Sequence, residues 1–240
     1  MMILFDYEEN KQTTIIKFTY LGRMDYLLTN TIKISEATLL EGAPMDIESW
    51  KNVDIGFIFA DASEHGIIDE LNVAIEAAKK ENVLIVPIIL SETKIDIDAV
   101  SLRFVNEDDL IKNISQSIKS ICDISCIPGL INLDISDIKT ILNGKGEFFL
   151  GLGKGHGKNA CIEAGKQAVN NLSKVCSSEN AKGILINVVG NENNLSIMEI
   201  MEAANVVHDW VANVSCNIIW GASTDNSLNS EIHVFIMMRD

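Results

Sequence analysis

The sequence predicts an α/β protein in which a parallel sheet with covering helices is followed by a second, compact domain. Residues 53–90 hold an apolar run, a helical pattern and a second apolar run, which together make a βαβ unit. Strands that are apolar along their whole length are typical of parallel sheets covered on both faces. From about residue 144 the order becomes β-α-β-α-β-β, which suits a compact sheet with helices on one face.

The composition limits the classes of function. A chain of 240 residues that is 47% hydrophobic can bury a sizeable core. The formal net charge of −15 repels phosphates, so neither nucleic acid nor an anionic membrane surface is an expected partner. The sequence has no run of 18 uncharged apolar residues and no secretory signal, so we expect a cytoplasmic protein. Five cysteines without a CxxC pair, and four scattered histidines, predict neither disulfides nor a metal site.

The first half contains the βαβ unit and three further strands. Its helix is predicted within residues 63–82, because apolar residues from Ile68 to Ala78 recur at spacings of three and four. Pro87 cannot donate a sheet hydrogen bond, so we expect it near a strand end or at a local irregularity. The expected strands cover residues 13–22, 29–39, 53–60, 83–90 and 100–105.

Two helices are expected between this sheet and the second domain. One begins at about Glu107 and carries isoleucines along one face, and the other runs from about Asp134 to Asn143. The segments expected in the second domain are strands at 147–153, 182–190, 215–223 and 231–238, and helices at 158–172 and 196–213.

The glycine-rich segment GLGKGHGK, residues 151–158, is a candidate phosphate loop, since glycines let backbone N–H groups approach a phosphate. Its spacing fits neither motif. A Walker loop needs a glycine where Leu152 stands and a serine or threonine where Asn159 stands, and the dinucleotide motif lacks its third glycine. We therefore predict a structural turn at which a strand and a helix pack closely.

The segment DASEHG, residues 61–66, follows the first strand of the βαβ unit, where open α/β sheets usually bind ligands. Asp61 and Glu64 would stabilise the start of the next helix by capping and by the helix dipole. The same charges would repel a nucleotide unless a metal bridged them. We expect the acids to act as caps.

The stretch PGLINLDISDIKTIL, residues 128–142, places Asp134 and Asp137 three residues apart at a predicted helix start. This spacing is typical of helix capping. It also leaves two carboxylates close together, and one carboxylate can cap its helix while pointing toward a neighbouring molecule.

From Cys126 onward the sequence resembles the FtsZ family of the tubulin superfamily. PGLINLDISDIKTIL is similar to the family pattern PGLINVDFADVRTVM, and GLGKGHGKNACIEAGKQAV is similar to its GxGxxxGxxRAxxAAxxAI. The segments GILINVVGNENNLSIMEIMEAANVV and IIWGASTDNSLNSEIHVFIM follow in the family's order. The resemblance implies a shortened Rossmann-like GTPase-type domain, a connecting helix and an FtsZ C-terminal (activation) domain. The implied segments are 1–125, 126–143 and 144–240.

The resemblance implies that the nucleotide loops are degenerate and that the catalytic loop is retained. The family's GGGTGTG loop lies where this chain has Asp61–Gly66, and its GGGGGNAV loop lies where the chain has LGRMDYLLTN, residues 21–30, with one glycine. Few backbone amides remain to hold a triphosphate, so GTP is not expected as a cofactor. Asn132, Asp134 and Asp137 match the catalytic loop, which in the family acts in trans on the GTP of an adjacent subunit.

The expected function is that of an FtsZ-like cytoskeletal or cell-division protein that acts by protein contacts, not as an enzyme on its own. Its partner would be a second copy of itself or a full-length FtsZ. In the second case the chain would cap an FtsZ filament by docking through its retained catalytic loop. One alternative is an active GTPase that polymerises with unusual loops, and another is a nucleotide-independent filament or dimer. The sequence ends directly after its last predicted strand, so we expect no direct membrane binding.

Overall fold

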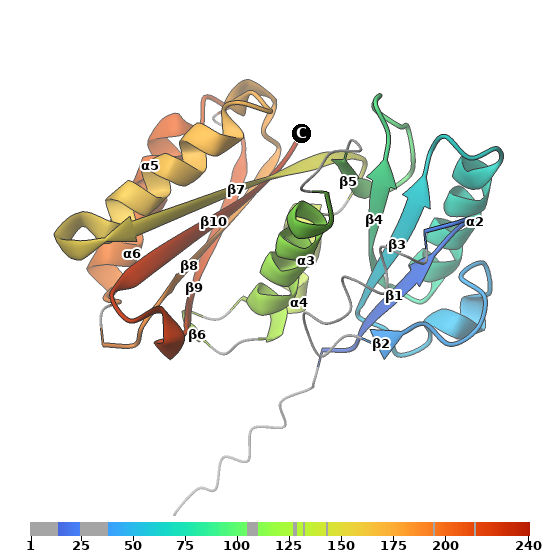
Figure 1. Cartoon of the computed structure of the whole chain (residues 1–240), viewed down its shortest axis with the longest axis horizontal. Helices are drawn as coiled ribbons and strands as arrows, with labels where there is room; N and C mark the ends of the chain where they lie inside the picture. The colour runs from blue at the N-terminus through green and yellow to red at the C-terminus, as the bar shows by residue number, and fades with distance from the viewer. Residues whose placement is uncertain are drawn as a thin grey trace, which may run out of the picture.

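The computed structural model of the chain describes residues 14–24, 38–104, 110–126, 129–131, 133–142, 144–193, 195–213 and 215–240. Ten strands in this part of the chain form a sheet in the order β2-β1-β3-β4-β5-β7-β10-β8-β9-β6. Figure 1 shows five layers from left to right: α5 with α6, the second half of the sheet, α3 with α4, the first half of the sheet, and α2. The predicted α/β class with two successive parts is confirmed.

The first half has the predicted βαβ unit in a parallel sheet. Both strands of the unit are almost fully buried, and α2 covers one face of the sheet with its apolar side. The strand expected at 29–39 lies mostly outside the described residues. The elements of this half are β1 (Ile16–Tyr20), β2 (Thr38–Leu39), β3 (Ile55–Asp61), α2 (Ile67–Lys80), β4 (Leu84–Leu90) and β5 (Val100–Phe104).

Pro87 lies inside β4, not at its end. The N–H of Leu84 donates to Asp54 of the strand on the β3 side, so by alternation the nitrogen of Pro87 faces the β5 side. The described pairing of β4 with β5 begins one residue later, at Ile88. The missing N–H of Pro87 therefore lies just before the first described residue pair of β4 and β5, at the edge of this ladder, where proline is tolerated.

The connecting segment lies between the two halves of the sheet. It consists of α3 (Leu110–Cys126), the short strand β6 (Gly129–Ile131) and α4 (Ile135–Leu142). The predicted helix near Asp134–Asn143 is confirmed, whereas β6 was not predicted. Ile114, Ile118 and Ile121 of α3 are fully buried. They belong to one core that also contains side chains from both halves of the sheet.

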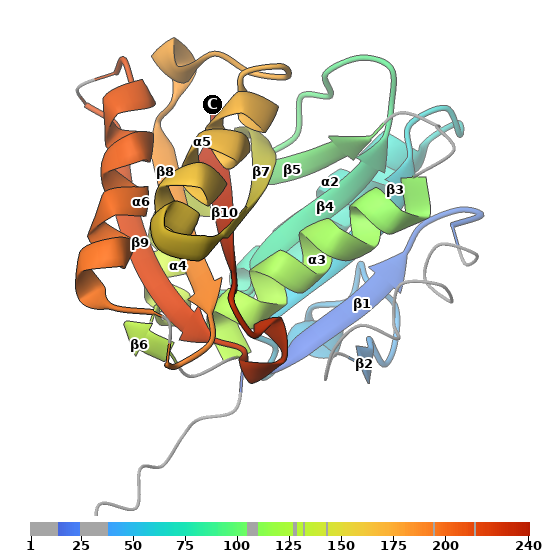
Figure 2. The ribbon, with the colours of Figure 1, turned by 60° about the vertical axis from the view of Figure 1, so that its left-hand side comes forward.

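The second half has the predicted order of strands and helices. β10 lies between β7 and β8 and is antiparallel to both, while β8 and β9 are parallel. Figure 2 shows α5 and α6 on the outer side of this part of the sheet. The elements are β7 (Gly146–His156), α5 (Ala160–Leu172), β8 (Gly183–Gly190), α6 (Ile197–Trp210), β9 (Asn217–Thr224) and β10 (Glu231–Arg239). The short 3-10 segments among the described residues are Ile47–Trp50, Gly157–Asn159, Ser178–Asn180 and Asn226–Leu228. The division into 1–125, 126–143 and 144–240 stays a prediction.

Residues 151–156 of the glycine-rich segment belong to strand β7 and not to the turn that we predicted, and the chain turns only at the 3-10 segment Gly157–Asn159. The predicted close packing against a helix is confirmed. A Cβ atom on Gly153 would lie 1.8 Å from the carbonyl oxygen of Ala164 in α5, and one on Gly155 would lie 1.9 Å from that of Ala160. The alternate glycines therefore let the backbone of α5 lie directly on the backbone of β7.

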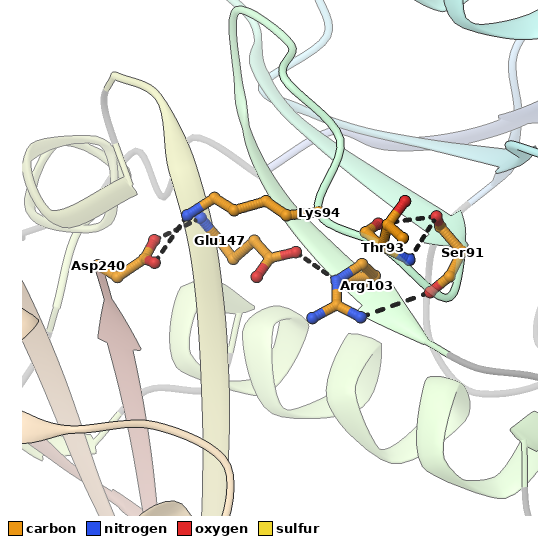
Figure 3. Close-up of polar contacts among 6 residues, drawn as sticks. All are labelled: Ser91, Thr93, Lys94, Arg103, Glu147 and Asp240. Atoms are coloured by element: carbon orange, nitrogen blue, oxygen red, sulfur yellow. Dashed lines mark hydrogen bonds and ion pairs between the residues drawn. The ribbon is translucent and has the colours of Figure 1, made fainter.

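The two halves are joined at the start of β7, where Val100 and Ser101 of β5 pair with Gly146 and Glu147. Figure 3 shows the polar contacts at this joint. Arg103 forms an ion pair with the buried carboxylate of Glu147, and Arg103 also donates to the carbonyl of Ser91 over 3.4 Å.

The backbone of Glu147 continues this joint toward the last strand. Its N–H donates to Asp240 Oδ1 over 2.7 Å, and Lys94 Nζ lies 2.8 Å from Asp240 Oδ2. A chain of charge-assisted bonds therefore runs from the loop after β4, across the start of β7, to the end of β10.

Gly153→Ala should destabilise the protein by about 1–3 kcal/mol or more, because α5 must move away from β7. Gly165→Ala is a matched control in the interior of α5, since its added Cβ meets Ala203 and Val206 at ordinary contact distances of 3.4 Å. It should be neutral or stabilising by about 0.5–1 kcal/mol. Urea unfolding measures both free energies. Equal effects of the two variants would contradict the close packing of α5 on β7.

Arg103→Ala should lower the free energy of unfolding by about 3 kcal/mol, because it leaves the Glu147 carboxylate buried without its partner. Lys94→Ala removes a comparable ion pair whose lysine is 55% exposed, and should cost less than about 1 kcal/mol. The two values are compared by urea unfolding at neutral pH. A cost for Arg103→Ala that is no larger than that for Lys94→Ala would show that the joint does not depend on this pair.

Candidate functional site

Two surfaces at opposite ends of the fold are candidates for function. The strand-end face consists of residues 21–24 after β1 and residues 61–66 after β3, which adjoin because parallel strands end at the same edge. The loop face consists of β6 and residues 133–137 at the start of α4. Lys139 of α4 donates to the carbonyl of Asn82, which precedes β4, so α4 lies at the opposite edge. In Figure 1 the arrows of β3 and β4 point up and α4 lies below.

On the loop face, Asp134 and Asp137 form a reciprocal cap on α4. Asp134 Oδ1 accepts the N–H groups of Ser136 at 2.8 Å and of Asp137 at 2.9 Å. Asp137 Oδ2 in turn accepts the N–H of Asp134 at 3.0 Å. This is the arrangement of a capping box with an aspartate at its third position. Asn132, the third predicted site residue, lies outside the described residues.

The environment of Asp134 keeps its carboxylate charged. The hydroxyl of Ser136 and the backbone N–H groups of Asp137 and Ser136 donate to it, and together they hold the pKa of Asp134 below its usual value. Asp134 is exposed and Asp137 is half-buried. Capping uses one oxygen of each carboxylate, so the other oxygens can accept hydrogen bonds from a neighbouring molecule.

Exposed apolar side chains lie at the same end of the fold as the loop face. β6 pairs with Ala222 and Ser223 at the end of β9, and β9 runs parallel to β8, which ends just before α6. Figure 2 shows β6 and the first turns of α6 near the same lower end. The exposed apolar residues here are Leu130, Ile197, Met198 and Met201, with Met198 76% exposed.

On the strand-end face, the Glu64 side chain closes the turn after β1. Glu64 Oε1 accepts the N–H of Arg23 at 3.0 Å. Its carboxylate also lies directly over Gly22, where an added Cβ would be 2.5 Å from Oε2 and 2.8 Å from Oε1. Gly22 has a φ of +63°, a conformation that glycine adopts without strain. The two loops after β1 and β3 are therefore linked by a carboxylate.

The expectation that Glu64 caps α2 is wrong. The N-cap of α2 is Gly66, which has no side-chain cap, and the Glu64 carboxylate is turned to Arg23 instead. Asp61 accepts the N–H of Ser63 at 2.9 Å and so caps a turn, not the helix. No sequence pattern indicated the bond from Arg23 to Glu64, because the two residues are 41 positions apart.

The strand-end face carries several negative charges. Besides Asp61 and Glu64, it is bordered by Asp69 and Glu70 in the first turn of α2. A triphosphate placed at this edge would face these carboxylates and would have to displace Glu64 from the turn.

Other groups with catalytic potential do not form a site. Among the described residues no group of three or more His, Cys, Asp or Glu could hold a metal ion. Glu231 at the start of β10 contacts Lys154 at 3.1 Å and His156 at 3.4 Å, and it also bonds His233. Burial raises the pKa of the Cys161 thiol to about 12, so this thiol stays protonated at neutral pH.

Comparison with known proteins supports the resemblance found in the sequence. Residues 146–240 match the model of the FtsZ family, C-terminal domain. A segment of 135 residues is 35% identical to the cell division protein FtsZ of Magnetospirillum gryphiswaldense, and the match covers 56% of this chain. The chain spans only 23% of that relative's length.

Two solved structures are similar to nearly the whole chain. An empty FtsZ dimer from M. jannaschii superimposes with a TM-score of 0.70 and 18% identity, covering 98% of this chain and 90% of that one. CetZ from Methanosaeta thermophila superimposes with a TM-score of 0.66 and 12% identity, covering 94% and 86%. At these low sequence identities, the similarity shows a shared fold and not a shared function.

The fold is an α/β fold similar to that of the solved FtsZ structure, in which a parallel sheet, a central helix and a mixed sheet follow one another. Over residues 146–240 the chain carries a C-terminal domain of the FtsZ family, and its fold as a whole is similar to that of a solved FtsZ structure. In the described part of the chain, no helix is long and apolar enough to cross a membrane.

Asp134→Ala should lower the free energy of unfolding by about 1 kcal/mol, because α4 loses its N-cap. Asp134→Asn removes the charge but keeps an oxygen that can accept the N–H groups of α4, so it should lower the free energy of unfolding by less than Asp134→Ala does. The wild-type carboxylate has a lowered pKa in the folded state, so its charge stabilises the protein fully above the unfolded pKa of about 3.9.

This stabilisation is lost as the pH falls through the lowered pKa of Asp134 in the folded protein. Urea unfolding as a function of pH measures the difference between wild type and Asp134→Asn. The difference should shrink on acidification below about pH 4. A difference that is constant over this range would contradict the role assigned to the Asp134 charge.

Proposed function

We propose that the chain is a cytoplasmic FtsZ-like protein that does not bind GTP and acts by docking its loop face onto a full-length FtsZ subunit. In this role it has no GTPase activity of its own. Asn132, Asp134 and Asp137 act only in trans, against a nucleotide carried by the neighbouring subunit. No cofactor is resident in the chain.

One observation carries this proposal: the turn after β1 is closed by the Glu64 carboxylate, while Asp134 at the opposite end is exposed. The strand-end face is where an open α/β sheet usually binds its ligand, and here a negative charge of the chain stands in that place. The loop face needs no nucleotide of its own. This asymmetry favours a subunit that offers its loop face to a neighbour but does not accept a neighbour's loop at its strand-end face.

The charges favour docking on a different protein over head-to-tail self-assembly. Self-assembly would bring Asp134 and Asp137 of one copy toward Asp61 and Glu64 of the next. Juxtaposed like charges at an interface cost several kcal/mol unless a cation screens them. Addition to an FtsZ filament does not bring these two pairs of acids together, and the chain would then present its closed, acidic face to the next subunit.

Exposed apolar side chains next to the loop face support protein contact there. Leu130, Ile197 and Met198 are each more than half exposed, and apolar side chains gathered near an exposed loop are typical of interfaces. A subunit docked by this end and closed at the other would cap a filament.

We expect the protein to shorten FtsZ filaments from the same cell and to change their GTPase rate at low molar ratios. Met198→Glu should weaken this effect by about tenfold or more, since it places a charge in the apolar part of the contact. Val73→Glu introduces the same group at a 50% exposed position on α2 and should keep the wild-type effect. Electron microscopy and phosphate release measure filament length and rate.

The docking proposal is wrong if neither filament length nor GTPase rate changes over a full titration with the wild-type protein. An equal loss of effect in Met198→Glu and Val73→Glu would place the contact elsewhere than the loop end. The alternative of an active polymerising GTPase predicts filaments of the purified chain that require GTP.

A further inference from the structure

The contact between Glu64 and the turn after β1 has the chemistry of a bound anion. The carboxylate accepts a backbone N–H from Arg23 and rests on Gly22, whose positive φ turns the chain around it. Successive backbone groups in such a turn form a concavity that favours negative charge. The anion comes from the chain itself, from the loop after the neighbouring parallel strand β3.

The position of this turn is fixed on both sides. The N–H of Leu21 donates to the carbonyl of Phe59 in β3 over 2.9 Å, and Leu21 and Met24 are buried beside it. The Glu64 backbone is held as well, since its N–H donates to the carbonyl of Asp61 over 3.1 Å. The carboxylate therefore joins two anchored segments, and its contact does not depend on a freely moving loop.

We propose that Glu64 is an internal strap that holds the turn Leu21–Met24 in its observed form and keeps phosphate groups out of it. The negative charge of Glu64 and its hydrogen bond from the Arg23 N–H both oppose the binding of a phosphate group in this turn. A bonded carboxylate orders the turn without a ligand, and a phosphate group could bind only after displacing it. This inference rests on the proposed function for its biological consequence, a strand-end face that stays closed in every nucleotide state of the partner.

The test compares three variants by amide hydrogen exchange at Arg23. Glu64→Ala removes the acceptor, and the exchange rate of the Arg23 N–H should rise by about tenfold or more. Glu64→Gln keeps an acceptor oxygen without the charge and should give an intermediate rate. Glu70→Ala removes one charge from the first turn of α2 without touching the turn after β1, and should leave the rate as in the wild type.

The second readout uses inorganic pyrophosphate as the probe. Calorimetric titration should show no binding to the wild type or to Glu70→Ala, and measurable binding to Glu64→Ala. Pyrophosphate should also restore the protection of the Arg23 N–H in that variant.

The strap is overturned if Glu64→Ala leaves the exchange rate unchanged, or if it binds pyrophosphate no better than Glu70→Ala. If Glu64→Ala fails to fold, Glu64→Gln decides the test. An exchange rate of the Arg23 N–H in Glu64→Gln that equals the rate in Glu70→Ala would also overturn the strap. These outcomes are separate from a failure of the proposed function. A wild-type chain without effect on FtsZ filaments would refute docking and leave the exchange results as they stand.

Discussion

The structure depends on the burial of α3 between the two halves of the sheet. Its isoleucines at 114, 118 and 121 are fully buried in a core that includes Phe57 of the first half and Met237 of the second. Each fully buried side chain of this size contributes about 1.5–3 kcal/mol of hydrophobic stabilisation. The described strand pairing between the halves consists of only two residue pairs of β5 and β7. We therefore attribute most of the association of the halves to the apolar core that they share.

This core also fixes the two ends on which the proposed function depends. α3 leads from the carboxyl edge of the first half toward β6 and α4, so the loop face emerges at the opposite edge from Glu64. Because both ends are anchored to one core, the subunit has a defined direction. One end is closed by the Glu64 carboxylate, and the other presents Asp134, an exposed acid that caps α4, near exposed apolar side chains. In the docking that we propose, a chain with one closed end would end a filament.

Much of this arrangement could be predicted from local patterns in the sequence. The strands around Phe57 and Ile88 are continuous apolar runs, and α3 has isoleucines at helical spacing, so their types followed from periodicity. Asp134 was correctly placed at a helix start, because capping is a local interaction over three residues. The whole resemblance to the FtsZ family also rests on contiguous motifs.

The features that escaped prediction depend on contacts between distant residues. The bond from Arg23 to Glu64 joins two loops that only sheet pairing brings together, and no spacing rule describes it. Gly155 was expected in a turn, and the predicted strand ended at Gly153. In the structure they alternate along β7, because the backbone of α5 occupies the space that side chains would fill. β6 has three residues and owes its strand conformation to pairing with β9.

The most direct test of the account is equilibrium binding of labelled GTP to the purified wild-type protein, with and without Mg²⁺. A turn after β1 that is closed by Glu64, at an edge lined with carboxylates, predicts no saturable binding up to about 1 mM, an affinity weaker than about 4 kcal/mol. Saturable binding in the micromolar range would contradict the account, because the nucleotide would then occupy the face that the structure closes.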